Sequence, residues 1–361
     1  MSFVTAMFLI DAPASALNNS GEPIPGARTE NTSSVKFIRA KDGNYPYVSA
    51  QAFRYWLRDT LESAQDIEWV KAPIYREDKI AYTDANPIFY WDDDLLGYMR
   101  APSKKKKEKE IVSADDPNLQ AMTPLEDEGG EPTTVTRAAP FRVSTLVSIA
   151  PLDNITADWG SMTRQEGDPV PYEHQFYRAT LRGAISLNLG LVGKFYYRRR
   201  TGFQNLDKVR RDLANTHQLE HLSSEFAYRF GQEERLRRVT SLLRAIGRLQ
   251  GGAKQTIHYT DVAPAAVICA VIRGGNNPFS YVFGHKNGIP VLYVETLQAA
   301  INDLWNDNQL LSPVFVGWKP GYLPDELDKL AQVSEVSVVT PRSAFENVAA
   351  WLAANPGALD A

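Results

Sequence analysis

The sequence has a single cysteine, Cys269, among its 361 residues. One cysteine excludes a disulfide framework and any zinc site built from several thiolates, so no oxidising compartment is needed and we expect a cytoplasmic protein. Long hydrophobic runs are also lacking, since no window approaches eighteen uninterrupted apolar residues, which argues against a membrane span. The N-terminus lacks the basic segment of a signal peptide, and its pattern favours a β-strand over residues 2–10.

Motifs for catalysis or cofactor binding are lacking as well. The chain contains no Gly-x-x-x-x-Gly-Lys-Ser/Thr loop, no Gly-x-Gly-x-x-Gly after a strand and no Gly-x-Ser-x-Gly turn. His217 and His221 have helical spacing but no third ligand, and Asp92-Asp93-Asp94 falls in an expected loop, so both groups are predicted to lie on the surface. Cys269 lies in an apolar strand and is predicted to be an inert buried thiol. We therefore predict no enzyme activity, no metal site and no cofactor.

Charge is present in both signs but unevenly spread, although the net charge is only −4. Residues 192–248 hold thirteen Lys and Arg against six acids, whereas residues 295–361 hold nine acids against three Lys and Arg. Such polarity can form a basic groove on an otherwise acidic protein. It can equally reflect solvated helix faces that neighbouring acids balance, and charge alone does not choose between the two.

The first part of the chain predicts strands followed by an amphipathic helix. A strand over 34–40 turns at Lys41-Asp42-Gly43-Asn44, where Asp-Gly supplies the positive φ angles of a tight hairpin. A helix then runs from the N-cap Ser49 to about residue 63. Its apolar stripe consists of Phe53, Trp56, Leu57 and Leu61. Another face carries Gln51, Arg54 and Arg58.

The middle of the chain predicts an insertion and a projection. Residues 83–140 lack periodicity and include the run Lys104–Lys107, which predicts a partly mobile region with a solvated loop or a weak nucleic-acid arm. Strands over 141–149 and 172–189 flank a polar excursion, 153–171, that resembles a projecting hairpin. Its exposed apolar side chains need a partner; alternatively, they fold back as a satellite core.

The remaining elements are a helix over 231–249, a strand over 262–272 and helices over 297–305 and 344–354. The 231–249 helix is followed by the glycine-rich segment 250–255, and the last helix begins with a capping box from Ser343 to Glu346.

The stretch Pro46-Tyr-Val-Ser-Ala-Gln-Ala-Phe-Arg-Tyr-Trp-Leu-Arg58 resembles the strand-to-helix element of the repeat-associated (RAMP) proteins of CRISPR systems. It is most similar to the DevR-type backbone subunit of type I Cascade complexes, in particular type I-B. Three features follow in the same order: the excursion ending in Pro-Val-Pro-Tyr-Glu, the strand through Arg182-Gly183-Ala184, and the segment Gly251–Lys254. The resemblance spans about residues 2–275.

The resemblance implies an α+β fold, a modified RRM/ferredoxin-like palm with a fingers insertion and a thumb β-hairpin. The palm would comprise 1–82, 141–152 and 172–361, with acidic C-terminal helices; the fingers 83–140; and the thumb 153–171. Members of this family polymerise along a CRISPR RNA without catalysis and present its bases to target DNA, in antiviral defence or RNA-guided transposition. The implied partners are CRISPR RNA, the target DNA strand, other copies of the chain head-to-tail, the RAMP cap subunits, and the large and small Cascade subunits.

The resemblance also implies a set of RNA-binding residues, because Lys and Arg neutralise phosphates and Gly lets main-chain amides approach them. These are Lys36, Arg39, Ser49, Gln51, Arg54, Arg58, Arg198, Arg199, Arg200, Gly251, Gly252, Lys254 and Gln255. The thumb would displace a base through Trp159, Met162 and Arg164.

Simpler roles remain open for these residues. Arg54 and Arg58 can pair with Asp59 or Glu62, and Arg198–Arg200 can form a solvated basic turn. Two other functions also remain open: a non-catalytic interaction scaffold, and a type III-like backbone subunit that cleaves target RNA through Asp42 and a divalent metal.

Overall fold

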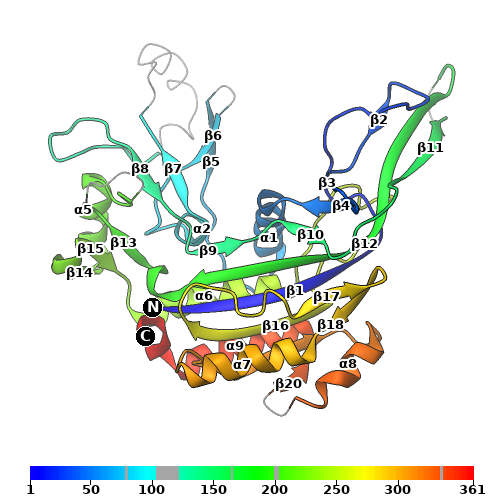
Figure 1. The fold of residues 1–361 in the computed structure, drawn as a ribbon. Coiled ribbons are helices and arrows are strands. Elements are labelled where there is room, and N and C mark those ends of the chain that lie inside the picture. The colour runs from blue at the N-terminus through cyan, green and yellow to red at the C-terminus, as the bar shows by residue number, and fades with distance from the viewer. Residues whose placement is uncertain (78–79, 103–121, 164–165, 199–202, 334–335) are drawn as a thin grey trace.

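The architecture is an α+β fold built on one large, mainly antiparallel sheet (Figure 1). The computed structural model describes residues 1–77, 80–102, 122–163, 166–198, 203–333 and 336–361. The sheet has the strand order β20-β19-β16-β1-β12-β10-β4-β3. In that order the strands span Val336–Val339, Val314–Trp318, Ala266–Arg273, Ser2–Ser15, Val170–Asn188, Leu146–Ser148, Gly43–Val48 and Phe37–Ala40. Three further strands pair with β12, namely β2 (Thr32–Ser33), β9 (Phe141–Val143) and β11 (Thr156–Met162).

The central strand β1 is apolar on both faces because both faces are covered. Its residues Val4, Ala6, Phe8 and Ile10 join one core with the helices α1 (Ala50–Ser63), α6 (Gln232–Ile246) and α9 (Pro341–Ala354). The alternate residues Phe3, Met7 and Leu9 join a second core with α7 (Val294–Asn306) and α8 (Pro324–Leu330). Alternation along a strand sends successive side chains to opposite faces, so one run of apolar residues serves two layers.

Several expected elements are confirmed. The strand over 2–10 is β1, the strand over 172–189 is β12, and the helix over 231–249 is α6, which ends three residues earlier than expected. Helix α1 begins at its expected cap, since Ser49 accepts a 3.3 Å hydrogen bond from the main-chain N–H of Ala52. In the hairpin β3–β4, only Gly43 of the Asp-Gly pair has a positive φ, 138°.

Other expectations were wrong in detail. The strand over 141–149 is interrupted between β9 and β10, where Ser144 bonds to Ala184 of β12 through both its main chain and its hydroxyl. Helix α9 is capped by Thr340, which accepts from the N–H of Ser343, because Pro341 occupies its first turn. Glu346 therefore does not complete a capping box; it binds Arg244 at 2.9 Å.

The region expected as an insertion contains regular structure. The hairpin of strands β5 (Ile74–Glu77) and β6 (Ile80–Thr83) ends where this region begins. Within the region, β7 (Tyr98–Arg100) pairs with β8 (Val135–Arg137), and the short helix α2 (Trp91–Leu96) precedes β7. The run Lys104–Lys107 lies outside the described residues. Nearby, β13 (Lys194–Tyr196), β14 (Glu220–Leu222) and β15 (Ala227–Arg229) form a small sheet beside α5 (Lys208–Thr216).

The small sheet corrects one expectation. His217 and His221 are both exposed, as predicted, but His217 is the C-cap of α5 and His221 lies on β14, so they do not share a helix. Each instead contacts an aromatic ring, His217 against Phe89 at 5.0 Å and His221 against Tyr228 at 4.7 Å between ring centroids.

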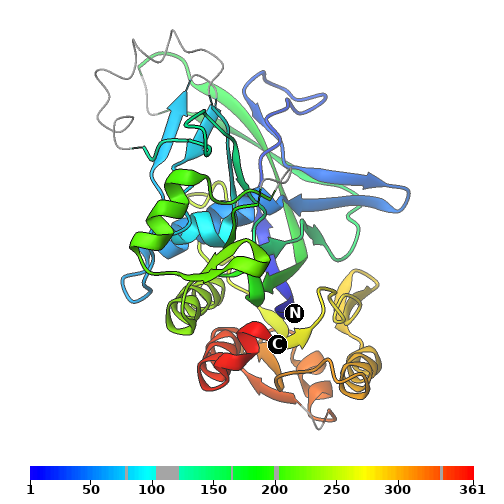
Figure 2. The same cartoon turned by 90° about the vertical axis from the view of Figure 1, so that its left-hand side faces the viewer.

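The elements after β16 form a compact group. Figure 2 shows this segment, coloured yellow to red, gathered at one end of the molecule, with the β5–β6 and β11–β12 hairpins at the other end. The group includes the hairpin of β17 (Phe283–Lys286) and β18 (Ile289–Leu292). Among the described residues, every helix is too short or too polar to traverse a bilayer.

Candidate nucleic-acid interface

The molecule is a crescent with two arms (Figure 1). One arm is the insertion with β5–β8, and the other is the projecting end of the β11–β12 hairpin. Helix α1 and strand β10 lie between the arms. The expected site residues that the structure describes come from several elements, and their contacts decide which of them can meet a ligand.

The N-terminal turn of α1 opens onto the concave side. The turn contains no acidic residue, and the side chain of Gln51 is exposed. A helix N-terminus carries partial positive charge and unpaired main-chain N–H groups, both of which favour phosphate. The hydroxyl of Ser49 already serves as the cap, so this residue contributes mainly by fixing where the helix starts.

Arg54 and Arg58 turn away from that opening toward the insertion. Arg54 donates to the main-chain carbonyls of Leu96 and Phe141 at 3.0 and 2.7 Å, and burial lowers the pKa of its guanidinium. Arg58 lies 3.9 Å from the buried carboxylate of Asp92. Within the described part of the chain, neither arginine forms an ion pair with Asp59 or Glu62; both link α1 to the insertion.

The glycine-rich loop lies against α1, on a different side from the two arginines. Gln250 donates its N–H to the Thr60 hydroxyl at 2.9 Å, and a Cβ on Gly251 would come within 2.6 Å of the Trp56 ring. Gly251 and Gly252 have φ angles of 136° and 103°, a region that only glycine enters readily. The structure thus brings the loop to α1, as the sequence suggested, but it does not bring Arg54 and Arg58 to the same side.

Lys254 and Gln255 complete the loop. Gln255 fixes its shape: the side-chain amide donates to the carbonyls of Gly251 and Thr260 and accepts from the N–H of Thr260. Lys254 has φ 54°, which is uncommon for a residue with a side chain, and burial lowers the pKa of its amine. Gln255 is therefore a structural residue, and Lys254 is the cation of the loop.

The projecting hairpin presents its two apolar residues on opposite faces. In the register of β11 and β12, Trp159 lies opposite Glu173 and Met162 lies opposite Val170. Side chains three residues apart on a strand point to opposite faces. Trp159 and Met162 are 50% and 51% exposed, so they do not form a satellite core. Arg164 lies outside the described residues.

Two expected cations lie on the β3–β4 side. Arg39 is exposed on β3, with its guanidinium 5.5 Å from the centre of the Phe37 ring. Lys36 precedes the strand and is partly exposed.

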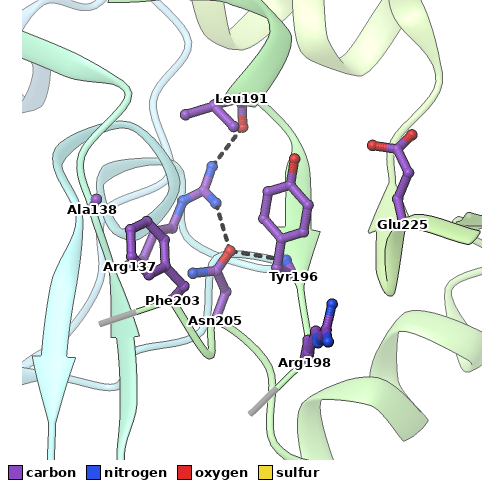
Figure 3. Close-up of a pocket in the computed structure, with 8 residues that line it drawn as sticks. All are labelled: Arg137, Ala138, Leu191, Tyr196, Arg198, Phe203, Asn205 and Glu225. Atoms are coloured by element: carbon purple, nitrogen blue, oxygen red, sulfur yellow. Dashed lines mark hydrogen bonds between the residues drawn. The ribbon is translucent and has the colours of Figure 1, made fainter. Parts of the chain in front are cut away.

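Arg198 follows β13 of the small sheet, and its guanidinium lies 5.2 Å from the ring centre of Phe226. It lines a pocket of about 380 Å³ with Tyr196, Phe203 and Glu225. At the back of this pocket the guanidinium of Arg137 donates to the Leu191 carbonyl and to the Asn205 side chain (Figure 3). Arg199 and Arg200 lie outside the described residues.

The described residues of the basic segment 192–248 do not form a basic groove. Three of its arginines, Arg210, Arg235 and Arg238, are at most 1% exposed and bind carboxylates and main-chain carbonyls. Exposed members also have acidic neighbours: Arg237 pairs with Glu68 and Glu234, and Arg248 with Asp66. The interpretation in which neighbouring acids neutralise the basic residues is therefore closer to the structure, except that three of the arginines are buried rather than solvated.

The expectation that Asp92-Asp93-Asp94 faces solvent was wrong. All three form part of α2 and are buried. Asp94 binds Arg137 and Arg238 and accepts from the N–H of Gly193 at 2.9 Å. Burial raises the pKa of Asp93 to about 7, with the neighbouring Asp92 charge adding to the shift.

The sequence did contain a signal for this cluster. Arg235 and Arg238 fall at helical spacing with Val239, Leu242 and Ile246, on the stripe that packs into the core. Arginine on a core stripe requires a buried carboxylate partner, because an unpaired buried charge is very costly. The Asp run, preceded directly by Trp91 and followed by two leucines, supplies that partner for Arg238 through Asp94, whereas Arg235 pairs with Asp360.

Cys269 is fully buried as expected, and burial raises the pKa of its thiol. Among the described residues, no three His, Cys, Asp or Glu side chains gather in a way that could hold a metal ion.

The sequence itself matches no protein-family model and no curated protein. The fold does match solved structures. A chain of a structure titled "CRISPR RNA-guided surveillance complex" aligns with a TM-score of 0.51 and 12% identity, over 97% of this chain and 99% of that one. A chain of a "CRISPR RNA-guided surveillance complex, pre-nicking" aligns with a TM-score of 0.52 and 12% identity, over 96% and 99%. Over nearly its whole length, this protein thus has the fold of chains found in CRISPR RNA-guided surveillance complexes.

Proposed function

We propose that the protein is a CRISPR RNA-binding backbone subunit of a type I Cascade complex, of the DevR type and similar to subtype I-B. The observation that carries the proposal is the fold match, which extends over 97% of this chain and 99% of a surveillance-complex chain. The subunit polymerises along the guide RNA and presents its bases to target DNA, in antiviral defence or RNA-guided transposition. It works without catalysis in the cytoplasm, beside the RAMP cap subunits and the large and small subunits.

The concave side supports this proposal through its geometry. The loop with Gly251, Gly252 and Lys254 packs on α1 at Trp56 and Thr60, and both the N-terminal turn of that helix and the loop offer main-chain N–H groups or positive charge to phosphates. The 2′-hydroxyls of RNA supply further contacts that DNA lacks. Arg39 and Arg198 are exposed and Lys36 is partly exposed, so these cations could add phosphate contacts.

The projecting hairpin supports head-to-tail assembly. A half-exposed Trp or Met on a projection can insert between bases, at an unstacking cost of a few kcal/mol, or can pack on a neighbouring copy. The projecting hairpin and the surface between the two arms are different parts of the molecule. A contact between the hairpin of one copy and that surface of the next is therefore heterologous, and it generates a helical filament rather than a closed dimer.

The first test is what the purified subunit carries. Expressed with a CRISPR array, the protein should co-purify with small RNA of uniform length in helical assemblies. A protein-interaction scaffold would carry no such RNA, and that result would overturn the proposal.

The second test separates a phosphate contact from a structural one. Lys254→Ala should reduce the slope of log affinity against log salt concentration by about 1, the effect of losing one phosphate contact. Arg54→Ala should leave the slope unchanged and lower the thermal stability, since this guanidinium is bound to the Leu96 and Phe141 carbonyls. Equal slopes for wild type and Lys254→Ala would remove the loop from the interface.

The RNA-cleaving alternative depends on Asp42. This residue is exposed in the β3–β4 turn and accepts a 2.7 Å hydrogen bond from the Tyr45 hydroxyl, which raises the pKa of Tyr45. Incubation with guide-complementary RNA and Mg²⁺ should leave that RNA intact. Cleavage that disappears in Asp42→Ala would favour the alternative.

A further inference from the structure

Two histidines lie together where the β11–β12 hairpin meets the glycine-rich loop. His174 belongs to β12 and His258 to the turn that follows the loop, and their rings meet edge to face with centroids 5.2 Å apart. Phe176 contacts both rings, at 6.1 Å from His174 and 5.1 Å from His258, and Tyr172 stacks on His174 at 5.9 Å. The pair therefore connects the hairpin to the loop that carries Lys254.

Each ring has a nitrogen that finds no hydrogen-bond partner within the part of the chain that the structure describes. These are Nδ1 of His174 and Nε2 of His258, both shielded from solvent. His174 is only 6% exposed. A buried polar atom without a partner costs free energy, so such atoms in a folded protein need an explanation, and an absent ligand is one.

Burial and nearby positive charge disfavour protonation of both rings in the free subunit. Burial is the main cause that lowers the pKa of both imidazoles, and the positive charge of Lys254 lowers them further. The charge of His258, when protonated, also lowers the pKa of His174. The opposing groups are weaker: Asp158 of β11 raises both pKa values, and a hydrogen bond to the Ala14 main chain raises that of His258.

We propose that Lys254, His174 and His258 form a phosphodiester site that takes up protons when RNA binds. The proposal rests on the RNA-binding function proposed above and assigns these two histidines to it. A phosphate next to Lys254 offsets the charge that disfavours protonation of the rings. Its oxygens accept hydrogen bonds from protonated imidazoles, and charge-assisted bonds of this kind are the strong ones.

The sign of the pH effect follows from this arrangement. Binding raises the pKa of the two imidazoles, so the complex holds more protons than the free subunit. Affinity for RNA therefore increases as pH falls, by up to about tenfold per pH unit for each histidine that takes up a proton. The increase begins near the raised pKa in the complex and ends below the lowered pKa in the free subunit.

The experiment measures the affinity of a fluorescein-labelled single-stranded RNA by anisotropy, at constant ionic strength, from about pH 8 to about pH 5.5, the range in which histidine titrates. We expect at least a tenfold gain for the wild type. His174→Gln with His258→Gln should bind with a nearly pH-independent affinity. His285→Gln removes an exposed imidazole from the distant β17 and should keep the wild-type gain.

A second measurement does not depend on variants or on RNA. Histidine ring resonances of the wild-type subunit report the pKa of His174 and His258, with and without inorganic phosphate. Phosphate should raise both. Unchanged values, or equal pH dependence in wild type and the double Gln variant, would overturn the inference, whereas absence of RNA binding at every pH, with a phosphate response intact, would overturn only the proposed function.

Discussion

Asp94 lies between two buried guanidiniums, those of Arg137 and Arg238, and is itself fully shielded from solvent. The two arginines come from different parts of the chain, the β8 strand and helix α6. The carboxylate therefore joins α2 of the insertion to the rest of the molecule. Removing one partner of a buried charge network leaves the others uncompensated.

Asp94→Asn should lower the free energy of unfolding by about 3–5 kcal/mol, as a lower midpoint of urea unfolding. The amide keeps the shape but cannot neutralise two guanidiniums. Asp66→Asn is the matched control, because it removes a carboxylate that pairs with Arg248 at an exposed position. A similar loss in both variants would contradict the structural role of Asp94.

Asp93 predicts a pH dependence of stability. Its pKa is raised to about 7 in the folded protein, against an ordinary value near 3.8. Between these values the folded state holds a proton that the unfolded state lacks, so the protein loses stability as pH rises from about 4 to about 7. Above that window both states are ionised and this contribution is constant.

Thermal unfolding from about pH 5 to about pH 8 checks this. Asp93→Asn should flatten the fall in melting temperature, since the amide stays neutral throughout. Asp59→Asn, which removes an exposed carboxylate from α1, should unfold with the wild-type pH profile. An unaltered profile in Asp93→Asn would show that Asp93 is ionised in the folded protein at pH 5.

At the scale of elements, the loop after α6 depends on glycine for two reasons. Gly251 has a positive φ, and an added Cβ would meet the Trp56 ring at 2.6 Å. Gly251→Ala should therefore shift the loop away from α1, at a strain cost of about 1–3 kcal/mol, and weaken RNA binding.

The control for this variant is Gly357→Ala, at a site with an ordinary φ and no atom near the added Cβ. Calorimetry and RNA affinity measure both effects. Wild-type affinity in a folded Gly251→Ala variant would show that the loop conformation is irrelevant to binding.

The projecting hairpin has two faces, and the structure therefore predicts that only one of its two candidate residues displaces a base. Trp159 and Met162 point to opposite faces, so a single face toward the guide can use only one of them to displace a base. With 2-aminopurine placed along the guide, the bright signal of an unstacked base should repeat at regular intervals. That signal should be lost in only one of Trp159→Ala and Met162→Ala, and both variants should keep wild-type stability because each side chain is half exposed.

The whole hairpin can be tested in the same way. A variant without residues 156–167 should remain folded, because the deleted part makes few contacts with the cores. It should bind RNA weakly and form no regular filaments by electron microscopy. Regular filaments from this variant would rule out the hairpin as the contact between copies.

At the scale of the whole molecule, the acidic segment 295–361 supplies carboxylates that neutralise arginines of the basic segment 192–248. Glu346 of the acidic tail binds Arg244 and lies 3.6 Å from Arg248, and Asp360 binds Arg229 and Arg235, all four arginines coming from the basic segment. The tail is therefore part of the architecture: α9 packs in the first core, and β19 and β20 extend the sheet. The expected terminal helices form, but within a larger strand-and-helix unit.

The sequence by itself determined the elements whose signals are local. Period-two and helical patterns located β1, β12, α1 and α6, and the cap at Ser49 was correct to the residue, because alternation, helical stripes and capping depend on neighbours a few residues apart. The glycine-rich loop and the projection at 153–171 were also visible as patterns.

Only the tertiary structure decided the roles of the charged residues. A guanidinium has the same local sequence signal whether it meets phosphate or a buried carboxylate, and the partners of Arg210, Arg235 and Arg238 lie up to 151 residues away in the chain. The same holds for His174 and His258, which the sequence did not single out. Their pairing arises only where a strand and a distant loop meet, because burial and long-range electrostatics are properties of the folded chain.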